Sequence, residues 1–470
     1  MGKTMLNKYR FFDPDKTIRD IAYNLYLNVK DLPIISPHGH VDPRLLAKNK
    51  PFPDPTELII IPDHYLFRML YSQGIPMQSL GIPTVDGTEV ERDHKKIWQI
   101  FADNFYLFRG TPTGMWLEHE LAEVFCIQEK LNSQNAMNIY DSIQEQLQSK
   151  EFLPRVLFNR LNIEVLSTTD GASDNLEYHK QIKESGWNGR VVPCFRPDAV
   201  VNITSKNWKL EIDKLGGISG IEITSYKKYI RAIKARREFF KSMGAVSTDQ
   251  GVYGTYTHRL SENESEAIFQ KALHGNASEE DSRFFTANFL MEMAAMSVED
   301  GLVMQIHPGV FRNYNTEILN KFGLDKGADI PVQTEYTKNL HELLNEFGNN
   351  KDLTIIVFTL DETTYSRELA PLAGHYPALK LGPAWWFNDS LHGMKRFREC
   401  VTETAGIYNT VGFNDDTRAF LSIPARHDLS RRIDSNYLAG MVARHIISTD
   451  EALIMGKALA YDLAKKAYKL

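Results

Sequence analysis

Eight short apolar runs recur along the chain, and most of them end in polar residues and precede a longer helical stretch. Short buried strands that alternate with helices pair in parallel, because each helix carries the chain back across the sheet. Eight such units favour an α/β fold of the (β/α)8 TIM-barrel type, and 470 residues suit such a barrel with insertions. We predict strands at 32–35, 165–170, 191–196, 245–249, 302–307, 354–361, 380–386 and 410–416.

The interval between the first two predicted strands is much longer than one crossover helix requires. Within it, Trp98, Phe101, Phe105 and Phe108 recur at helical spacing. A second helix-rich stretch is expected at 206–243, and we interpret its basic run at 227–237 as the solvated face of a helix. The predicted division of the chain is an N-terminal segment with the first strand at 1–66, a helical insertion at 67–155 and the remainder of the barrel at 156–470.

Charge and composition argue against several classes of function. The net charge is −6, whereas proteins that bind nucleic acid usually carry a basic excess. The chain shows no signal peptide and no apolar run of the roughly 18 residues that a membrane helix requires. Its three cysteines are far apart, which indicates reduced thiols. We expect a cytoplasmic protein without nucleic-acid or membrane partners, and the lack of a Gly-rich phosphate loop argues against a nucleotide cofactor.

Two histidines follow the first predicted strand directly. Residues i and i+2 of a strand point to one face, so His38 and His40 are expected to converge at the mouth of the barrel. Asp416 and Arg418 close the eighth predicted strand with the same spacing. Since the eighth strand of a closed barrel lies beside the first, Asp416 is placed to join the histidines around a divalent cation such as Zn²⁺. A structural pair between Asp416 and Arg418 is the alternative.

Further polar and aromatic residues follow other predicted strands, at the end of the barrel where active sites collect. Arginine forks bind carboxylates, while Trp, Tyr and Asn suit a polyhydroxylated ring or chain. The set therefore favours an acidic sugar as substrate, with packing or a structural ion pair as the alternative for each residue taken singly. The candidates are His64, Tyr65, Arg68, Arg196, His307, Arg312, Trp385, Trp386 and Asn388.

Seven short segments follow one another in order over nearly the whole chain, namely His38-x-His40, Asp63-His64-Tyr65-x-x-Arg68, Ser167-Thr168-Thr169-Asp170, Phe195-Arg196-Pro197-Asp198, His307-x-Gly309-x-x-Arg312-Asn313-x-Asn315, Trp385-Trp386-Phe387-Asn388-Asp389 and Asp416-x-Arg418. Individually these segments are modest, but their common order is specific. Together they resemble the uronate (glucuronate) isomerases, a divergent family of the amidohydrolase superfamily. A tail at 422–433 also resembles that family.

The resemblance implies interconversion of D-glucuronate and D-fructuronate, or of D-galacturonate and D-tagaturonate, by proton transfer through a cis-enediol. It implies His38, His40 and Asp416 as ligands of one divalent metal, for which we expect Zn²⁺ in an orienting role that turnover need not require. We expect Asp416 to be the main proton shuttle, and one of Arg196 and Arg312 to bind the carboxylate of this small-molecule hexuronate. A homo-oligomer is also expected. The remaining groups implied for catalysis or binding are His64, Tyr65, Trp386 and Arg418.

Two positions depart from the family pattern. Ser36 stands where the family often has Asp, and Gln250 follows Asp249 where the family often has His. The alternatives are a metal-dependent hydrolase of the amidohydrolase type, a uronate epimerase and a sugar-binding protein without activity. Many amidohydrolases use a second histidine pair and a carbamylated lysine at the fourth strand, and residues 249–250 offer neither.

Overall fold

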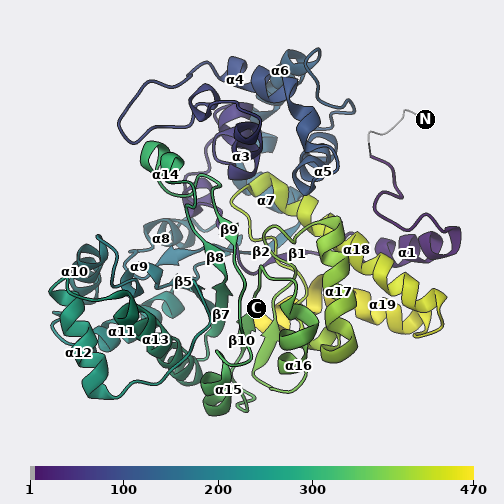
Figure 1. Ribbon diagram of the computed structural model, residues 1–470. Coiled ribbons are helices and arrows are strands. Elements are labelled where there is room, and N and C mark those ends of the chain that lie inside the picture. The colour runs from purple at the N-terminus through teal and green to yellow at the C-terminus, as the bar shows by residue number, and fades with distance from the viewer. Residues whose placement is uncertain (1–5) are drawn as a thin grey trace.

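The computed structural model describes residues 6–470, and its main strands run parallel around a central barrel (Figure 1). Hydrogen bonding orders them as β1-β2-β4 and as β11-β10-β7-β6-β5-β3, while β8 and β9 form a separate antiparallel pair. Because β3 prolongs β2 and β5 prolongs β4 after short breaks, the two sheets are continuous. The strands are β1 (Ile34–Ser36), β2 (Ile163–Ser167), β3 (Asp170–Gly171), β4 (Arg190–Val192), β5 (Phe195–Arg196), β6 (Ser247–Val252), β7 (Val303–Pro308), β8 (Val310–Phe311), β9 (Ile330–Pro331), β10 (Ile355–Val357) and β11 (Leu379–Leu381).

The segment at 410–417 closes the barrel. Thr410 pairs in parallel with Leu381 of β11, and the backbone N–H of His40 donates to the carbonyl of Thr417 at 2.9 Å. The fold is therefore a (β/α)8 barrel, as predicted. The strand predicted at 410–416 is wrong beyond Thr410, because the backbone enters the left-handed region at Gly412 (φ 77°) and Asp416 (φ 39°).

The other seven predicted strands are present with altered ends. All six residues of β7 are buried, as expected for a parallel strand between an outer helical layer and a filled interior. The fourth strand extends to Val252, beyond the predicted end at residue 249. The strands predicted at 354–361 and 380–386 are too long, because only Ile355–Val357 and Leu379–Leu381 pair with neighbours.

Two of the helices on the outside of the barrel begin at serine caps, and one of these ends at a glycine. Ser261 and Ser278 form capping boxes at the starts of α12 and α13, and Gly301 ends α13 with a φ of 78°. These helices and turns are α8 (Glu177–Glu184), α9 (Asp198–Val201), α10 (Trp208–Ser219), α11 (Tyr226–Ser242), α12 (Glu262–Leu273), α13 (Glu279–Asp300), α14 (Thr316–Phe322), α15 (His341–Phe347), η6 (Tyr365–Leu369), α16 (Ala370–Ala373) and α17 (Leu391–Ala405).

The basic run at 227–237 lies on α11, but only part of it is solvated. Arg236 and Arg237 are buried, and Nε of Arg237 lies 2.7 Å from Oδ2 of Asp300 at the end of α13. The interpretation of this run as a solvated face is therefore wrong for these two arginines. They join α11 to its neighbours, since a buried guanidinium requires a partner.

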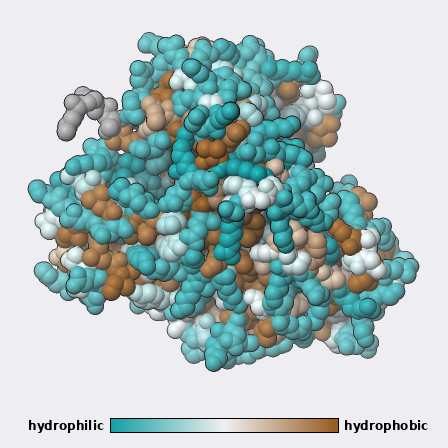
Figure 2. Space-filling model, turned by 180° about the vertical axis from the view of Figure 1, so that it is seen from behind, coloured by the Kyte–Doolittle hydropathy of each residue, from teal (hydrophilic) through white to brown (hydrophobic). Residues whose placement is uncertain are grey.

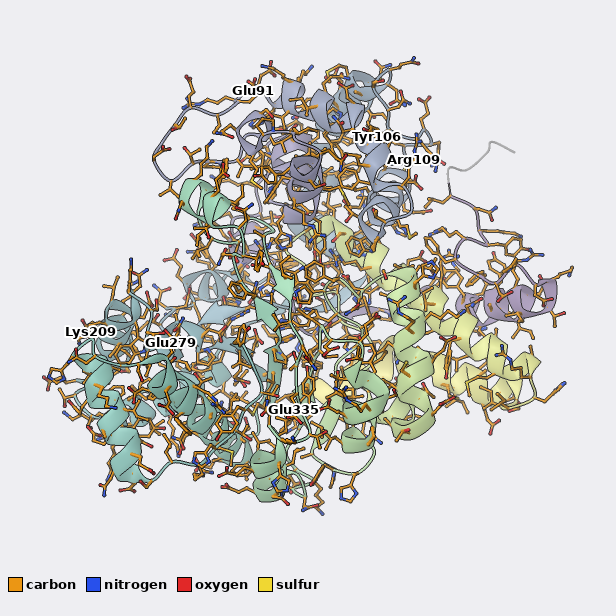
Figure 3. The ribbon with its side chains drawn as sticks, viewed as in Figure 1. Glu91, Tyr106, Arg109, Lys209, Glu279 and Glu335 are labelled. Atoms are coloured by element: carbon orange, nitrogen blue, oxygen red, sulfur yellow. The ribbon has the colours of Figure 1, made fainter. Side chains whose placement is uncertain are left out.

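Between β1 and β2 the chain forms a helical lobe beside the barrel (Figure 1). Trp98, Phe101 and Phe108 are buried in an apolar cluster of this lobe, and the indole of Trp98 donates to the carbonyl of Ala136 at 2.9 Å. Figure 3 places Glu91, Tyr106 and Arg109 on its outer side. Domain boundaries at 66/67 and 155/156 stay a prediction. The lobe contains α2 (Pro43–Lys48), η1 (Thr56–Ile60), α3 (His64–Ser72), η2 (Met77–Leu80), α4 (His94–Asp103), η3 (Phe105–Phe108), α5 (Pro112–His119), η4 (Glu120–Val124), α6 (Ala136–Leu147), η5 (Lys150–Phe152) and α7 (Pro154–Arg160).

The long helix α18, near the C-terminal end of the chain, packs against residues near the N-terminal end. Asp428 of α18 accepts hydrogen bonds from Arg10 at 2.6 Å and from Tyr26 of α1. On its other side, Arg398 of α17 and Asp434 of α18 form a buried bidentate pair, with N–O distances of 2.6 and 3.0 Å. The terminal elements are α1 (Lys16–Val29), η7 (Ile407–Asn409), η8 (Phe420–Ser422), α18 (Ile423–Ala443), α19 (Thr449–Lys457), η9 (Ala458–Asp462) and α20 (Leu463–Tyr468).

On the face seen in Figure 2, apolar side chains are scattered among hydrophilic ones. Across residues 6–470, no helix combines the length and the apolar character needed to cross a membrane.

Candidate active site

The predicted site residues gather around one hollow at the mouth of the barrel, which encloses about 700 Å³ between protein atoms, open solvent included. Arg68 and Asn388 do not line it. Arg68 lies over the ring of Phe387 at 5.1 Å, and Asn388 donates to the carbonyl of Leu360 at 3.3 Å, so their contact with substrate stays a prediction. The predicted residues that line the hollow are His38, His40, His64, Tyr65, Arg196, His307, Arg312, Trp385, Trp386, Asp416 and Arg418.

Side chains from the two ends of the polypeptide meet in this hollow. Nε2 of His38 and Nε2 of His40 lie 3.5 and 3.1 Å from Oδ1 of Asp416. The other oxygen of Asp416 accepts a hydrogen bond from the indole of Trp385. Oδ1 itself is buried and receives no hydrogen bond of ordinary geometry from residues 6–470. The closure of the barrel thus brings these groups together as the sequence predicted.

His307, at the end of β7, joins His38 and Asp416 in a group of side chains that could hold a metal ion. Single ligand atoms of His38, His307 and Asp416 all lie within 4.8 Å of one another. The ring of His307 stacks on that of His38 with centroids 4.6 Å apart. Its Nε2 is buried without a partner among the described residues, while its Nδ1 lies 2.6 Å from Oδ1 of Asp249. The sequence predicted His40 as a ligand instead, and His307 only as a substrate contact.

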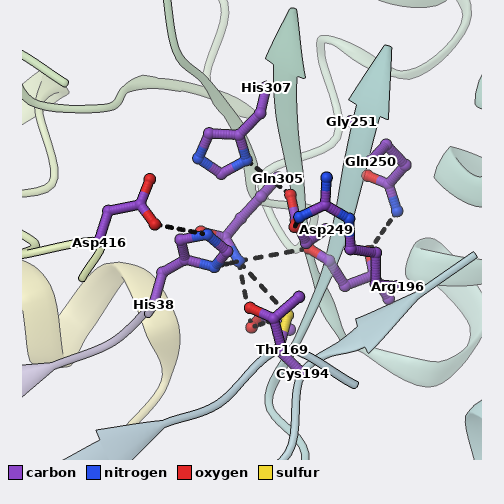
Figure 4. Close-up of polar contacts among 12 residues, drawn as sticks. His38, Thr169, Cys194, Arg196, Asp249, Gln250, Gly251, Gln305, His307 and Asp416 are labelled. Carbon is purple, nitrogen blue, oxygen red and sulfur yellow. Dashed lines mark hydrogen bonds and ion pairs between the residues drawn. The ribbon is translucent and has the colours of Figure 1, made fainter. Parts of the chain in front are cut away.

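These donors fit a divalent transition metal. Imidazole nitrogens and one carboxylate oxygen are the ligands that Zn²⁺ takes in catalytic sites. A ligating histidine usually donates from its other nitrogen to a carboxylate, which is the position of Asp249 behind His307. Two buried atoms to which no hydrogen bond is assigned among residues 6–470, Nε2 of His307 and Oδ1 of Asp416, face the same space (Figure 4).

Burial and charge set the protonation of this group. Burial lowers the pKa of His38 to about 4, in spite of the carboxylates nearby. Burial alone would raise the pKa of Asp416, but the surrounding imidazoles, with His38 first, hold it below its ordinary value. Asp416 is therefore ionised and His38 neutral near pH 7, the forms that can bind a cation.

Arg196 is held at the end of β5 by two carboxylates. Its Nε donates to Oδ2 of Asp198 at 2.7 Å, and its Nη1 lies 3.1 Å from Oδ2 of Asp249. A Cβ on Gly251 would lie 2.5 Å from both Nη2 of Arg196 and Oδ2 of Asp198, so this close approach requires glycine. Since Asp249 also binds His307, Arg196 is coupled to the histidine group (Figure 4).

The start of α3 contributes His64 and Tyr65 to the hollow. Oδ1 of Asp63 caps the helix by accepting from the backbone N–H of Tyr65 at 2.8 Å. Burial and the surrounding arginines, with Arg418 first among them, lower the pKa of His64 to about 3. Burial raises the pKa of Tyr65 well above its ordinary value. Both groups are thus neutral near pH 7.

Arg312 and Arg418 are the exposed cations of the hollow. The guanidinium of Arg312 lies 4.9 Å from the ring centre of Trp386. Its Nη1 is 3.7 Å from Oδ2 of Asp329, a long ion-pair distance, and the side chain is 43% exposed. Compared with Arg196, Arg312 thus has the weaker internal partner, which leaves it available to an anion.

Contacts on either side of Asp416 hold its left-handed backbone. Asp415 accepts from His427 of α18 at 3.0 Å, and the hydroxyls of Thr417 and Ser422 lie 3.1 Å apart. A non-glycine residue with a φ of 39° is strained, and such strain persists where the surroundings impose it. The start of α18 thus positions Asp416.

Three further charged residues also line the hollow, namely Asp63, Asp389 and Arg426. Arg426 lies 3.6 Å from the ring centre of Trp116 and donates to Oδ2 of Asp389 at 2.8 Å. A signal for them was present, because all three lie in segments that carried the family resemblance. What the sequence did not show is that α18 returns to the mouth of the barrel.

Gln250 and Ser36, the two departures from the family pattern, are both buried. Nε2 of Gln250 donates to the hydroxyl of Thr248 at 2.8 Å, which turns it away from His307. Of these two neighbouring residues of the fourth strand, Asp249 is the one that contacts His307.

Comparisons with known proteins agree with this arrangement. The family model described as glucuronate isomerase matches residues 10–468. The uronate isomerase of Nostoc punctiforme is 55% identical over 100% of this chain and 99% of its own length. The crystal structure of glucuronate isomerase from Caulobacter crescentus superimposes with a TM-score of 0.97 at 52% identity, covering 99% of this chain and 98% of that chain.

A more distant structure shows the same fold. The uronate isomerase of Thermotoga maritima is 28% identical, with a TM-score of 0.92 over 98% of this chain and 99% of that chain. The match of the family model to nearly all of the chain, with relatives of this identity and coverage, leads to one conclusion: this chain belongs to the uronate (glucuronate) isomerase family.

Proposed function

We propose that this hollow isomerises hexuronates between the aldose and ketose forms, namely D-glucuronate with D-fructuronate, D-galacturonate with D-tagaturonate, or both. The observation that supports this most is the ionised carboxylate of Asp416, which lies between two imidazoles and an indole in a hollow that the exposed fork of Arg312 also lines. Such a base near positive charge suits abstraction of a proton next to a carbonyl. Membership of the family supports the same reaction.

The reaction moves two protons within one substrate. The C2 proton of the open-chain aldose leaves to a base, and the carbonyl oxygen O1 gains a proton, which gives the cis-enediol. The O2 hydroxyl then loses its proton, and C1 receives one, which gives the ketose. We assign the carbon-bound proton to Asp416. His64 and Tyr65, both neutral near pH 7, are placed to exchange the hydroxyl protons.

A divalent cation, for which we propose Zn²⁺, would be held by His38, His307 and Asp416, with His40 adjacent. When bound, it supplies positive charge that stabilises the enediolate oxygens. We assign the same electrostatic role to Arg418, a residue of the chain itself that is exposed at the mouth. The chain's own groups hold the substrate and carry its protons.

Removal of the cation is expected to lower activity only a few-fold, because isomerisation requires no activated water. The measurement is kcat for D-glucuronate after dialysis against a chelator, with metal content determined on the same sample. Zn²⁺ added back to the dialysed protein serves as control. A loss of two orders of magnitude, restored by Zn²⁺, would show that the cation drives the chemistry.

Arg312 is our candidate for the residue that binds the substrate carboxylate, because Arg196 already serves two carboxylates. Replacing Arg312 with Met is expected to raise KM for D-glucuronate about 10- to 100-fold with a smaller change in kcat, since a charge-assisted hydrogen bond contributes about 1.5–3 kcal/mol. Steady-state kinetics measure both constants.

Arg283 is a matched control, because its guanidinium also stacks on an aromatic ring, 4.4 Å from the centre of Tyr256, but outside the hollow. The Arg283→Met variant should keep the KM of the natural chain. An unchanged KM in Arg312→Met, together with a raised KM in Arg196→Met, would show that Arg196 binds the substrate carboxylate instead.

The proposed function is tested by incubating the protein with both aldohexuronates in D₂O and identifying the products by NMR. Isomerisation gives the ketose, with solvent deuterium at C1 where the base exchanges. An epimerase would return an aldose of inverted configuration, and a hydrolase would act only on amides, esters or lactones. The residues of the fourth strand disfavour hydrolysis, since β6 offers Asp249 and Gln250 in place of a lysine or a histidine pair.

The cytoplasm is the compartment we propose, supported by the thiols of Cys126, Cys194 and Cys400, none of which forms a disulfide. We also keep a homo-oligomer as a proposal, to be tested by light scattering on the purified protein. The substrate proposed is a small molecule.

A further inference from the structure

The last helix of the chain enters the barrel from the end opposite the site. Nζ of Lys469 donates to the carbonyl of Gly301 at 2.9 Å, directly before β7 begins. Tyr468 is fully buried among Val303 of β7, Ile356 of β10 and Val411. Figure 1 shows the C-terminus at the centre of the barrel. α20 therefore closes the N-terminal end of the barrel, and Tyr468 points along the interior.

The hydroxyl of Tyr468 reaches a polar residue in the middle of β7. It donates to Oε1 of Gln305 at 2.8 Å, and both side chains have no exposed surface. Nε2 of the same amide lies 3.5 Å from Nδ1 of His38. The chain of contacts thus runs from the C-terminal helix through one amide to the first histidine of the site, and Figure 4 shows Gln305 and His38 side by side.

We propose that Tyr468 and Gln305 are positioning residues, which hold the imidazole of His38 so that its Nε2 faces Asp416 and the cation. The inference deepens the proposed function and rests on its metal site. Nε2 of His38 already lies 3.5 Å from Oδ1 of Asp416, so Nδ1 is the nitrogen left for a partner. The groups behind a ligating histidine fix its ring orientation and its tautomer.

The hydrogen bond from Tyr468 to Oε1 is the shortest contact of this amide. Nε2 of Gln305 lies 3.3 Å from the hydroxyl of Ser247 and 3.4 Å from the carbonyl of Thr248, slightly closer than the 3.5 Å to His38, and 3.7 Å from the sulfur of Cys194. An amide offers both a donor and an acceptor, and a hydroxyl serves as either. When Nε2 of His38 binds a cation, Nδ1 carries the proton, so the amide turns to accept from Nδ1 through Oε1 while the hydroxyl of Tyr468 accepts from Nε2 of Gln305.

The test measures the affinity of the metal-free protein for Zn²⁺ by competition with a chromophoric chelator. Tyr468→Phe keeps the buried ring and removes the hydroxyl, and Gln305→Leu removes the amide. Both variants are expected to bind Zn²⁺ about 10- to 100-fold more weakly than the natural chain, the usual effect of losing a partner behind a metal ligand. Gln305→Glu keeps an acceptor for Nδ1 of His38 and should bind within a few-fold of the natural chain.

Tyr229→Phe is the matched control, because Tyr229 is equally buried and donates to a backbone carbonyl, that of Val200, at 3.1 Å. It loses the same kind of hydrogen bond far from His38 and should bind Zn²⁺ as the natural chain does. Unfolding midpoints of all variants separate a loss of stability from a loss of affinity. Should Tyr468→Phe fail to fold, the difference in Zn²⁺ affinity between Gln305→Leu and Gln305→Glu still tests the positioning role.

The outcomes distinguish two failures. If the natural chain does not bind Zn²⁺, the proposed metal site is wrong, and this inference falls with it. If the natural chain binds Zn²⁺ and both Tyr468→Phe and Gln305→Leu bind equally well, the metal site stands and the positioning role is overturned. A weakening shared by Tyr229→Phe would also overturn it, because the effect would then be one of general stability.

Discussion

Replacing Asp416 with asparagine is expected to lower kcat for D-glucuronate at least about 10²-fold, the lower part of the range for loss of a positioned acid–base group. The substitution keeps the shape of the side chain and the acceptor for the Trp385 indole. It removes the negative charge that faces His38 at 3.5 Å and His40 at 3.1 Å. An amide cannot take the proton from C2, so turnover should fall even where substrate still binds.

Asp42 provides the matched control at the same end of the barrel. Its side chain is 58% exposed and caps α2 by accepting from the backbone N–H of Arg44, a role that asparagine fills equally well. Asp42→Asn should therefore turn over normally. Metal content of Asp416→Asn must be measured beside kcat, because Asp416 is also a proposed ligand. Near-normal turnover in Asp416→Asn would place the base elsewhere in the hollow.

Replacing Asp434 with alanine is expected to lower the free energy of unfolding by about 3–5 kcal/mol, the cost of leaving a buried charge without its partner. Arg398 and Asp434 are 5% and 8% exposed and share two hydrogen bonds between α17 and α18. The guanidinium cannot lose its proton to relieve the penalty. The measurement is the shift of the urea unfolding midpoint, followed by circular dichroism.

An exposed ion pair serves as the comparison. Asp213, 60% exposed, pairs with Lys209 one turn away on α10, so Asp213→Ala should leave the midpoint almost unchanged. Replacing Arg398 and Asp434 together with Leu should recover much of the loss, because well-packed apolar residues replace a buried ion pair at little cost. An unaltered midpoint in Asp434→Ala would contradict the buried-pair argument.

Local sequence pattern predicted the barrel because it reflects burial. Strands buried on both sides read as short apolar runs, so seven of the eight were found, and β7 nearly to the residue. Helical spacing likewise identified the aromatic cluster around Trp98 in the lobe. The strand ends were less predictable, because pairing with neighbours decides where a strand stops. At 410–416 the left-handed backbone of Gly412 and Asp416 ends the pairing despite an apolar run.

The site was predictable to the extent that it follows from strand order. His38 and His40 share a face by alternation, and Asp416 reaches them because a closed barrel brings its last segment beside its first. The position of Arg68 outside the hollow was not predictable. Its guanidinium lies over the ring of Phe387, and the direction of that ring depends on a left-handed backbone at Phe387. The stacking of His307 on His38 was not predictable either, because it depends on how far β7 extends towards the mouth of the barrel.

By itself, the sequence determined the barrel, the order of its strands and the polar residues that follow them, because alternation and apolar runs are local consequences of burial. Only the tertiary structure decided which side chains come within a few ångströms of each other. It brought α18 back to hold Asp416, inserted Tyr468 from the opposite end towards Gln305, and buried Arg398 against Asp434. These contacts join residues far apart in the chain, and their distances depend on helix packing that no local pattern records.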